Sequence, residues 1–199
     1  MPADIEHLGH ASFRLSGGGK VVYVDPYKLT SSPHDATAVL VTHGHFDHCY
    51  ATDVAKVAGR DTVIVASADC RGKLGGVGAR FIGLRPGDEV DAGGVPVKAV
   101  AAYNTDKDFH PKANNWVGYV VTIGGETVYH AGDTDVIPEM EGLAPDVALL
   151  PVGGTYTMTA EEAAKAFGIL KAKRGIPMHF GSVVGTDADA ERFRKLIGG

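Results

Sequence analysis

An apolar segment that runs directly into a cluster of imidazole and carboxylate side chains constrains this chain more than any other feature. Residues 38–48 read AVLVTHGHFDH, so the apolar run is followed at once by His43, His45, Asp47 and His48. Such a continuous run is typical of a strand that is covered on both faces. Because crowded imidazoles and carboxylates need partners, the fold must bring this strand end to a place that satisfies them.

The spacing of these side chains suits metal binding. In an extended segment, side chains two positions apart point the same way, so His43 and His45 can reach one cation. Asp47 and His48 follow the strand and can turn to a second cation nearby. Neutral imidazole is the commonest metal ligand, and two-metal hydrolytic sites hold their ions roughly 3.5–4 Å apart. The pattern predicts two divalent metal ions, with zinc first and manganese or iron as alternatives.

Three later segments also carry ligand-type side chains where an apolar strand is expected to end. These side chains are Asp133 after VYHAG, His179 after IPM, and Asn104 and His110 within AAYNTDKDFH. Functional residues of layered folds commonly lie on loops at one edge of the sheets. Together with the cluster at 43–48, these segments predict one composite site.

Strand-like segments outnumber helix-like ones in this glycine-rich chain. Strands are expected over residues 4–8, 11–15, 20–26, 38–43, 61–67, 79–84, 95–102, 116–125, 126–133, 146–154 and 174–181. Helices are expected over 51–59, over 159–172 with Thr159 and Glu162 as a capping box, and over 187–198 with Asp187 as the cap. This pattern favours an α/β fold in which two mixed β-sheets pack face to face with helices outside.

Composition narrows the class of protein. The 199 residues can form a real core and contain no Ser/Pro linker, so we expect a single domain over residues 1–199. A net charge of −5 without a basic block argues against nucleic-acid binding, and no apolar run is long enough for a membrane span. Two cysteines make no disulfide framework, and the acidic start is unlike a signal peptide, so a cytoplasmic location is expected.

The motifs THGHFDH, HAGDT and PMHF, in this order, resemble those of the metallo-β-lactamase superfamily over nearly the whole chain. Within it, LGHASFRL at 8–15 and YVDP at 23–26 resemble the branch that contains the ascorbate-6-phosphate lactonase and the N-acyl phosphatidylethanolamine phospholipase D type enzymes. The resemblance implies an αββα sandwich with a dinuclear metal site at one edge. It also implies six metal ligands: His43 and His45 on the first metal, Asp47, His48 and His179 on the second, and Asp133 bridging both.

The first metal lacks one histidine that the family places after a strand in the middle of the chain. Asn104 stands at that position. Either Asn104 binds through its oxygen, or His110 reaches in from the same loop, or the first site is deficient. We predict His110, since imidazole is the better ligand for a borderline metal.

The predicted site points to a metal-dependent hydrolase. Two cations lower the pKa of a bridging water, and the metal-bridging hydroxide then attacks an ester, lactone, amide or phosphodiester bond of a small molecule. Asp47 is expected to orient the hydroxide and take its proton. His10 follows Gly9 in a break between strands, where the resemblance places it near the site. It is a candidate catalytic residue that contacts substrate or metal-bound water, and a structural histidine of the turn is the alternative.

Two other functions stay open on the sequence alone. One is a phosphodiesterase or nuclease of the same fold, and the other is a non-catalytic metal-binding or sensor protein with an incomplete first site. The sequence does not predict an oligomeric state. Among neighbouring residues, Asp25 either orients a ligand histidine or caps a turn, His130 is expected in the core, and Tyr156 either lines the pocket or belongs to a plain loop.

Overall fold

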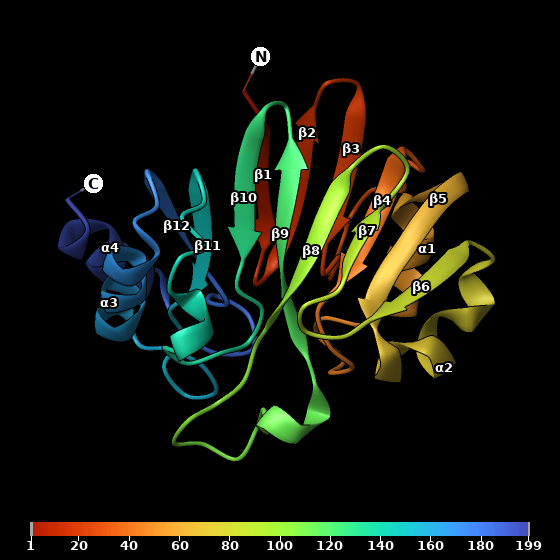
Figure 1. Cartoon of the computed structure of the whole chain (residues 1–199). Helices are drawn as coiled ribbons and strands as arrows, with labels where there is room; N and C mark the ends of the chain where they lie inside the picture. Colours follow the sequence, from red (N-terminus) through yellow and green to blue (C-terminus); the bar gives the residue numbers. More distant parts are fainter. Residues whose placement is uncertain (1, 199) are drawn as a thin grey trace.

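A six-stranded mixed sheet formed by the N-terminal half makes one layer of the structure, a computed structural model that describes residues 2–198 (Figure 1). Its strands follow one another across the sheet in chain order: β1 Asp4–Gly9, β2 Ser12–Gly17, β3 Lys20–Val24, β4 Ala36–Val41, β5 Ala58–Ser67 and β6 Arg80–Leu84. Strands β1 to β3 pair antiparallel, whereas β3 to β6 pair parallel.

The C-terminal half forms a second six-stranded mixed sheet. Its strands also keep chain order: β7 Glu89–Asp91, β8 Pro96–Ala101, β9 Val117–Ile123, β10 Glu126–His130, β11 Val147–Pro151 and β12 Arg174–Met178. Strands β7 to β10 pair antiparallel, and β10 to β12 pair parallel. Two mixed sheets are what the strand pattern predicted.

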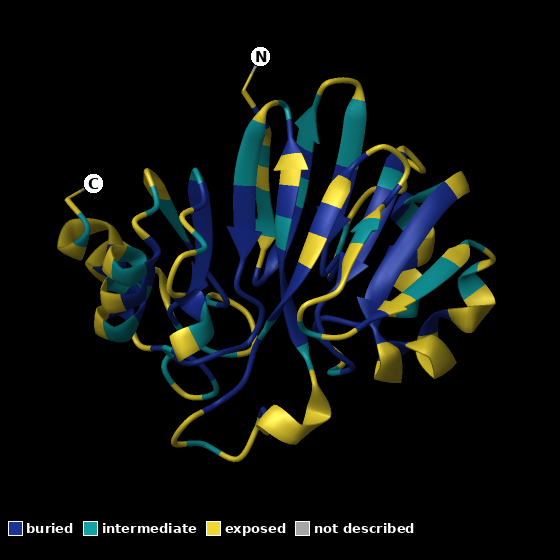
Figure 2. Cartoon of the chain, viewed as in Figure 1, coloured by how far each residue is buried: buried dark blue, intermediate teal, exposed yellow. Residues whose placement is uncertain are grey.

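The hydrophobic core lies between the two sheets. Phe13 and Leu15 of β2 and Tyr119 and Val121 of β9 are all fully buried in it. Figure 2 shows the same contrast along the chain, with buried strand centres and exposed helix surfaces. The Tyr119 hydroxyl also donates a hydrogen bond of 2.8 Å to the Val41 carbonyl, which joins the second sheet to the end of β4. Burial of apolar area is the main force that holds the layers together.

Helices cover the outer faces of the sandwich. They are α1 Ala51–Val57, α2 Arg71–Leu74, α3 Ala160–Leu170 and α4 Asp187–Leu196, with 3-10 turns η1 Ala68–Cys70, η2 Gly75–Val77, η3 Lys112–Asn114 and η4 Pro138–Met140. Helices α1 and α2 pack on the first sheet, while α3 and α4 pack beside β11 and β12 (Figure 1). The arrangement is the expected αββα sandwich.

The helix caps agree with the sequence in one case and differ in the other. Thr159 caps α3, since its side chain accepts a hydrogen bond from the Glu162 N–H and the Glu162 carboxylate accepts one from the Thr159 N–H. Asp187 was the wrong cap for α4. The cap is Thr186, whose N–H donates to the Asp189 carboxylate at 2.8 Å, so Asp187 is already the first helical residue.

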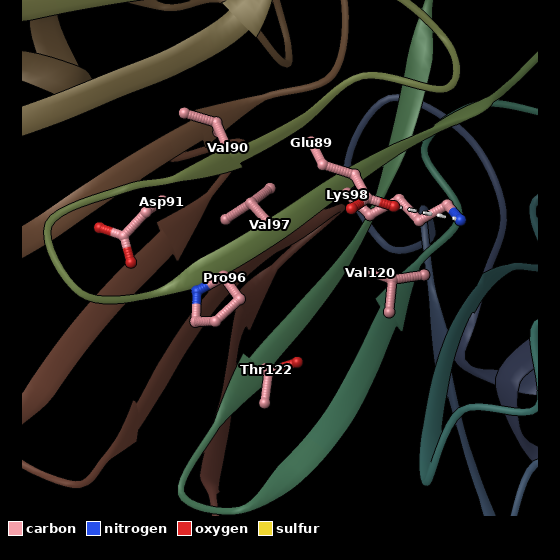
Figure 3. Close-up of a pocket in the computed structure, with 8 residues that line it drawn as sticks. All are labelled: Glu89, Val90, Asp91, Pro96, Val97, Lys98, Val120 and Thr122. Atoms are coloured by element: carbon pink, nitrogen blue, oxygen red, sulfur yellow. Dashed lines mark ion pairs between the residues drawn. The ribbon is translucent and has the colours of Figure 1, made fainter.

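One surface pocket lies away from the metal-type residues. It has a volume of about 510 Å³ on β7, β8 and β9, where Glu89 and Lys98 form an ion pair of 3.4 Å (Figure 3).

No helix within residues 2–198 is long and apolar enough to cross a membrane.

Strands from both sheets end at the same edge of the sandwich. Strands β4 and β10 run toward the lower edge in Figure 1, and β12 is parallel to β11 and β10. The loops that follow them carry residues 42–50, 131–137 and 179–186, which places the predicted ligand segments on this one edge.

Gly118 permits the close approach of β9 to the end of β10. A Cβ atom there would lie 2.6 Å from the carbonyl oxygens of both His130 and Ala131. We expect Gly118→Ala to lower the free energy of unfolding by roughly 1–3 kcal/mol, because the backbone must shift to accept the methyl group. In α3, a Cβ at Gly168 meets nothing within 4 Å, so Gly168→Ala should raise stability by roughly 0.5–1 kcal/mol. Urea unfolding measures both, and equal shifts would contradict the packing argument.

Candidate metal centre

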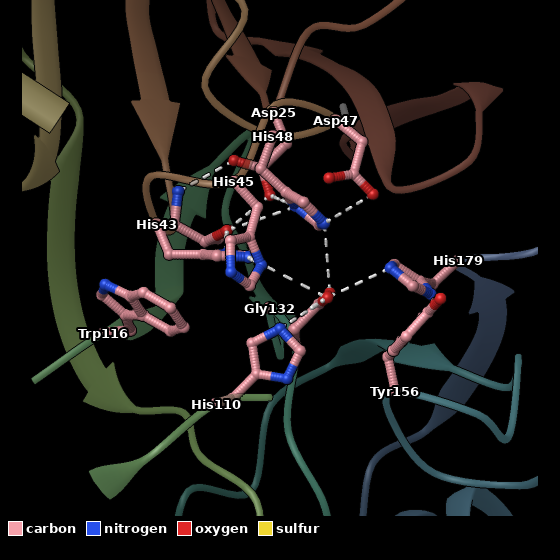
Figure 4. Close-up of polar contacts among 12 residues, drawn as sticks. Asp25, His43, His45, Asp47, His48, His110, Trp116, Gly132, Tyr156 and His179 are labelled. Carbon is pink, nitrogen blue, oxygen red and sulfur yellow. Dashed lines mark hydrogen bonds and ion pairs between the residues drawn. The ribbon is translucent and has the colours of Figure 1, made fainter. Parts of the chain in front are cut away.

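The structure brings the eight predicted site residues together at this edge of the sandwich. Figure 4 labels His43, His45, Asp47, His48, His110 and His179 among them. They form overlapping groups in which one ligand atom from each member lies within 4.8 Å of the others. The groups are His43, His45 and His110; His10, Asp47, His48 and His179; and His43, His48 and Asp133.

The Asp133 carboxylate lies at the centre of the cluster. Its Oδ2 atom is 3.1 Å from Nε2 of both His110 and His179 and 4.0 Å from Nε2 of His43. Its Oδ1 atom is 3.3 Å from Nε2 of His48. Burial raises the pKa of this carboxyl, but the electrostatic interactions with His179 and His48 outweigh burial and hold the pKa well below its usual range. Asp133 is therefore an ionised carboxylate with imidazoles on several sides.

The first histidine group is assembled by a loop rather than by a strand. Strand β4 ends at Val41, and the chain then bends so that His43 Nε2 and His45 Nδ1 lie 3.0 Å apart. The two rings therefore meet, although not through the extended backbone expected from their spacing. Burial lowers the pKa of both side chains. They are neutral at pH 7, which is the form that binds a metal.

The second group joins the two ends of the chain. Nε2 of His10 lies 3.0 Å from Oδ2 of Asp47, and the rings of His10 and His179 have centroids 4.1 Å apart. The His179 N–H also donates to the His10 carbonyl at 2.8 Å. Both histidines have a left-handed backbone, with φ of 52° at His10 and 59° at His179. Non-glycine residues adopt this conformation at an energetic cost, and such residues cluster at functional sites.

His10 lies behind Asp47 rather than in the wall of the cavity. It is only 3% exposed, and the hydrogen bond that its ring makes is the one to Asp47. A catalytic role for His10 stays a prediction, and this contact favours an action through Asp47. Burial raises the pKa of Asp47, but the hydrogen bond from His10 and the charge of His48 outweigh it, so Asp47 is ionised.

Several buried polar atoms of the cluster have no hydrogen-bond partner. A buried donor or acceptor left unpaired costs about 1–3 kcal/mol, and native proteins contain few of them. Here they gather in one place: Nε2 of His48, His110 and His179, Nδ1 of His10 and His179, and Oδ1 of Asp133. Nitrogen and carboxylate oxygen atoms that face one another in this way form a donor set that fits divalent cations.

Asp25 fixes the orientation of His48. This fully buried carboxylate accepts hydrogen bonds from the Thr42 N–H at 2.8 Å, the Thr42 hydroxyl at 2.7 Å and Nδ1 of His48 at 2.7 Å. The Thr42 oxygen can then accept from Nδ1 of His43 at 3.0 Å. Burial lowers the pKa of His48, but the charges of Asp133 and Asp25 raise it well above the usual value. Because these hydrogen bonds use Nδ1 of His43 and of His48, both rings present Nε2 to the centre of the cluster.

Asn104 holds His110 in the same way. Its Oδ1 atom accepts from both the backbone N–H and Nδ1 of His110, each at 3.0 Å. Its Nδ2 group donates to Asp135 and to the Tyr156 carbonyl at 3.2 and 3.0 Å. These bonds occupy both ends of the Asn104 amide, whereas His110 points Nε2 at Asp133 from 3.1 Å.

Trp116 and Asp69 belong to the site but were not predicted. The Trp116 ring lies 4.8 Å from the rings of both His43 and His45, and its Nε1–H donates to Asp69 at 2.9 Å. The same Asp69 oxygen accepts from the Gly44 N–H at 3.1 Å. No short sequence motif predicts these contacts, which join segments far apart in the chain.

His130 is a core residue, as expected. It is fully buried, its Nε2 donates to the Ala11 carbonyl at 2.8 Å, and its Nδ1 accepts from the Gly132 N–H at 3.2 Å. The second bond shapes the turn before Asp133, and Gly132 has the positive φ of 65° that this turn requires.

A cavity of about 200 Å³ connects the centre to solvent. Its walls are His45, Phe46, Asp47, Phe109, His110, Asp133, Tyr156, His179 and Val183. Tyr156 is thus a pocket residue, one of the two possibilities that the sequence left open.

The chain is similar to known proteins over nearly its whole length. Residues 4–179 match the family described as a beta-lactamase superfamily domain. A UPF0173 metal-dependent hydrolase of Pyrococcus abyssi is 38% identical over 98% of this chain and 92% of that protein. A crystal structure from Parabacteroides distasonis superposes with a TM-score of 0.83 at 31% identity, covering 98% and 88% of the two chains. The metallo hydrolase Igni18 of Ignicoccus hospitalis gives 0.79 at 26% identity, covering 98% and 90%.

Replacing Asp25 tests its effect on His48. We expect Asp25→Asn to lower metal affinity by about 10–100-fold, because an amide cannot accept all three hydrogen bonds and His48 loses its fixed orientation. The measurement is zinc competition against a chromogenic chelator. Asp61 is exposed on β5, so Asp61→Asn is the control and should match the parent. Unchanged zinc affinity in Asp25→Asn would remove the orienting role.

Proposed function

The chain belongs to the metallo-β-lactamase superfamily of metal-dependent hydrolases, and we propose that it uses two divalent cations to hydrolyse an ester or lactone bond of a small molecule. The observation that carries this proposal is the position of Asp133. Its two oxygens lie within 4.0 Å of imidazole nitrogens on both sides, so this carboxylate would be a ligand available to both proposed cations.

The proposed ligands fall into two sets that share this carboxylate. One set is His43, His45 and His110, and the other is Asp47, His48 and His179, which lie together with His10. Asp133 would serve both sets, since its oxygens lie near His43, His48, His110 and His179. Zinc is the proposed metal, since the ligands are imidazole nitrogens and carboxylate oxygens. The unpaired Nε2 atoms of His48, His110 and His179 support this assignment, because metal binding would satisfy them.

When bound, the two cations supply an attacking water of lowered pKa and a Lewis acid for the oxygen on which charge develops. The chain's residues do the rest. Asp47, held by His10 at 3.0 Å, orients the water and accepts its proton. The water oxygen bonds to the acyl carbon, the bond to the leaving oxygen breaks, and that oxygen departs with a proton. The products are a carboxylic acid and an alcohol.

The branch of the superfamily, the number of domains, the location in the cell and the size of the substrate are also proposals. Segments 8–15 and 23–26, which resemble the branch of the lactonase and the phospholipase-like enzymes, deliver His10 and Asp25 to the cluster. That placement supports their importance for the site, while membership of the branch stays a proposal. One apolar core joins both sheets, which supports a single domain. A cytoplasmic location and a small-molecule substrate stay predictions.

Metal content separates the roles of His110 and Asn104. We expect two ions per chain in the parent protein, one in His110→Ala, and two in Asn104→Ala with the first bound more weakly, since His110 is then free to rotate. Inductively coupled plasma mass spectrometry after dialysis against graded chelator measures both quantities. If Asn104→Ala loses an ion and His110→Ala keeps both, the ligand is Asn104.

Asp47→Asn tests the proton transfer. The substitution is nearly isosteric, but the amide accepts no proton, so turnover should fall by about 10²–10⁴ or more. Turnover of a generic ester and a lactone is measured together with metal content and thermal midpoint, and removal of metal by chelator should abolish it reversibly. His130→Gln is the control and should mainly lower the thermal midpoint. Full turnover in Asp47→Asn with both metals bound would overturn the role.

A further inference from the structure

Large apolar side chains that reach solvent gather at the mouth of the metal centre. Within residues 2–198, those exposed are Phe46, Tyr50, Phe109, Val183 and Leu196. Three of them, Phe46, Phe109 and Val183, line the cavity that opens above the proposed ligands. A single exposed apolar residue is ordinary, whereas a group around one opening marks a binding surface.

The aromatic rings of this rim are held in place before any ligand arrives. The Phe109 ring meets Tyr156 edge to face, with centroids 4.7 Å apart and planes at 89°. The Phe46 ring meets Tyr27 at 6.1 Å and 76°. Such edge-to-face pairs are favourable, so two rings that are 48% and 60% exposed keep defined orientations. A preformed apolar wall loses little entropy when it binds an apolar group.

Cationic side chains are missing from the described walls of the cavity, which contain no lysine and no arginine. Lys107 lies in the same loop as Phe109, but its Nζ is bound to Asp106 and Asp135 at 2.8 Å each. Lys28 donates to the Ser182 hydroxyl at 3.0 Å. Sites that recognise phosphate groups generally use free arginine or lysine side chains. A phosphate group away from the proposed cations would therefore find no lysine or arginine partner in these walls, which favours an uncharged group there.

We propose that the substrate is uncharged beside the scissile bond and carries a short aliphatic or aromatic acyl group that packs against Phe46, Phe109 and Val183. This inference rests on the proposed ester or lactone hydrolysis and makes these three residues specificity-determining. The cavity volume of about 200 Å³ lies below the roughly 300–1,000 Å³ of pockets for drug-sized ligands, so the buried group is small.

The test is a chain-length series on the zinc-loaded protein. The substrates are 4-nitrophenyl acetate, butyrate and hexanoate, each corrected for its spontaneous hydrolysis. We expect kcat/KM to rise roughly fourfold per methylene until the cavity is filled, because each buried CH₂ contributes that factor. Phe109→Ala should flatten the dependence, Phe109→Leu should keep most of it, and Leu196→Ala on α4 should leave it unchanged.

Binding supplies a readout that does not depend on turnover. Trp116 is the only tryptophan of the chain and lies beside His43 and His45, so its fluorescence reports ligands at the centre. Acetohydroxamate and hexanohydroxamate are titrated into the zinc-loaded parent and Phe109→Ala proteins. We expect the longer chain to bind more tightly in the parent, by roughly fourfold per buried methylene, and to lose this advantage in the variant.

The outcomes separate the two proposals. Ester hydrolysis with no chain-length dependence in turnover or binding would overturn the acyl specificity and leave the hydrolase function intact. Chain-length-dependent binding without hydrolysis of any ester or lactone would overturn the reaction while supporting the apolar subsite. Faster turnover of 4-nitrophenyl phosphate than of all the carboxylic esters would reject the uncharged substrate.

Discussion

A buried carboxylate surrounded by imidazoles is the constraint on which this molecule depends. Asp133 is 4% exposed and ionised, so its charge must be balanced inside the protein. The imidazoles of His43, His48, His110 and His179 face it from both sheets, and the raised pKa of His48 provides a positive charge beside it. Such an arrangement tolerates little displacement, because each imidazole must keep one nitrogen directed at the same point. The two-layer sandwich supplies this rigidity through strands whose ends meet at one edge.

A second layer of polar groups decides which nitrogen each ring presents. Asp25 accepts from Nδ1 of His48, whereas Asn104 accepts from Nδ1 of His110. The two devices have the same geometry but differ in charge, since a carboxylate makes its imidazole more basic and an amide does not. Asn104 stands where a ligand histidine was expected, and in this chain its side chain orients the histidine six positions later, His110 (110 − 104).

The sequence predicted those parts of the site that local spacing encodes. His43, His45, Asp47 and His48 follow one strand within a single loop, so their convergence could be inferred from the pattern itself. Trp116 could not be found in this way, because its place beside these rings depends on how β9 crosses the first sheet. Contacts between sheets are set by packing that no short segment records. For the same reason, the sequence did not predict the aromatic rim of the cavity, because Phe46 and Phe109 come from separate loops.

The hydrogen bond from the His179 N–H to the His10 carbonyl joins residues 169 positions apart (179 − 10), so it can form only after almost the whole chain has been synthesised. His43, His45, His110 and Asp133 have all been translated well before His179 leaves the ribosome. Under the proposed assignment, the chain has therefore made all the residues of one ligand set before it makes the last residue of the other. A chain shortened before His179, by premature termination or proteolysis, would keep the proposed first set and lose a member of the second.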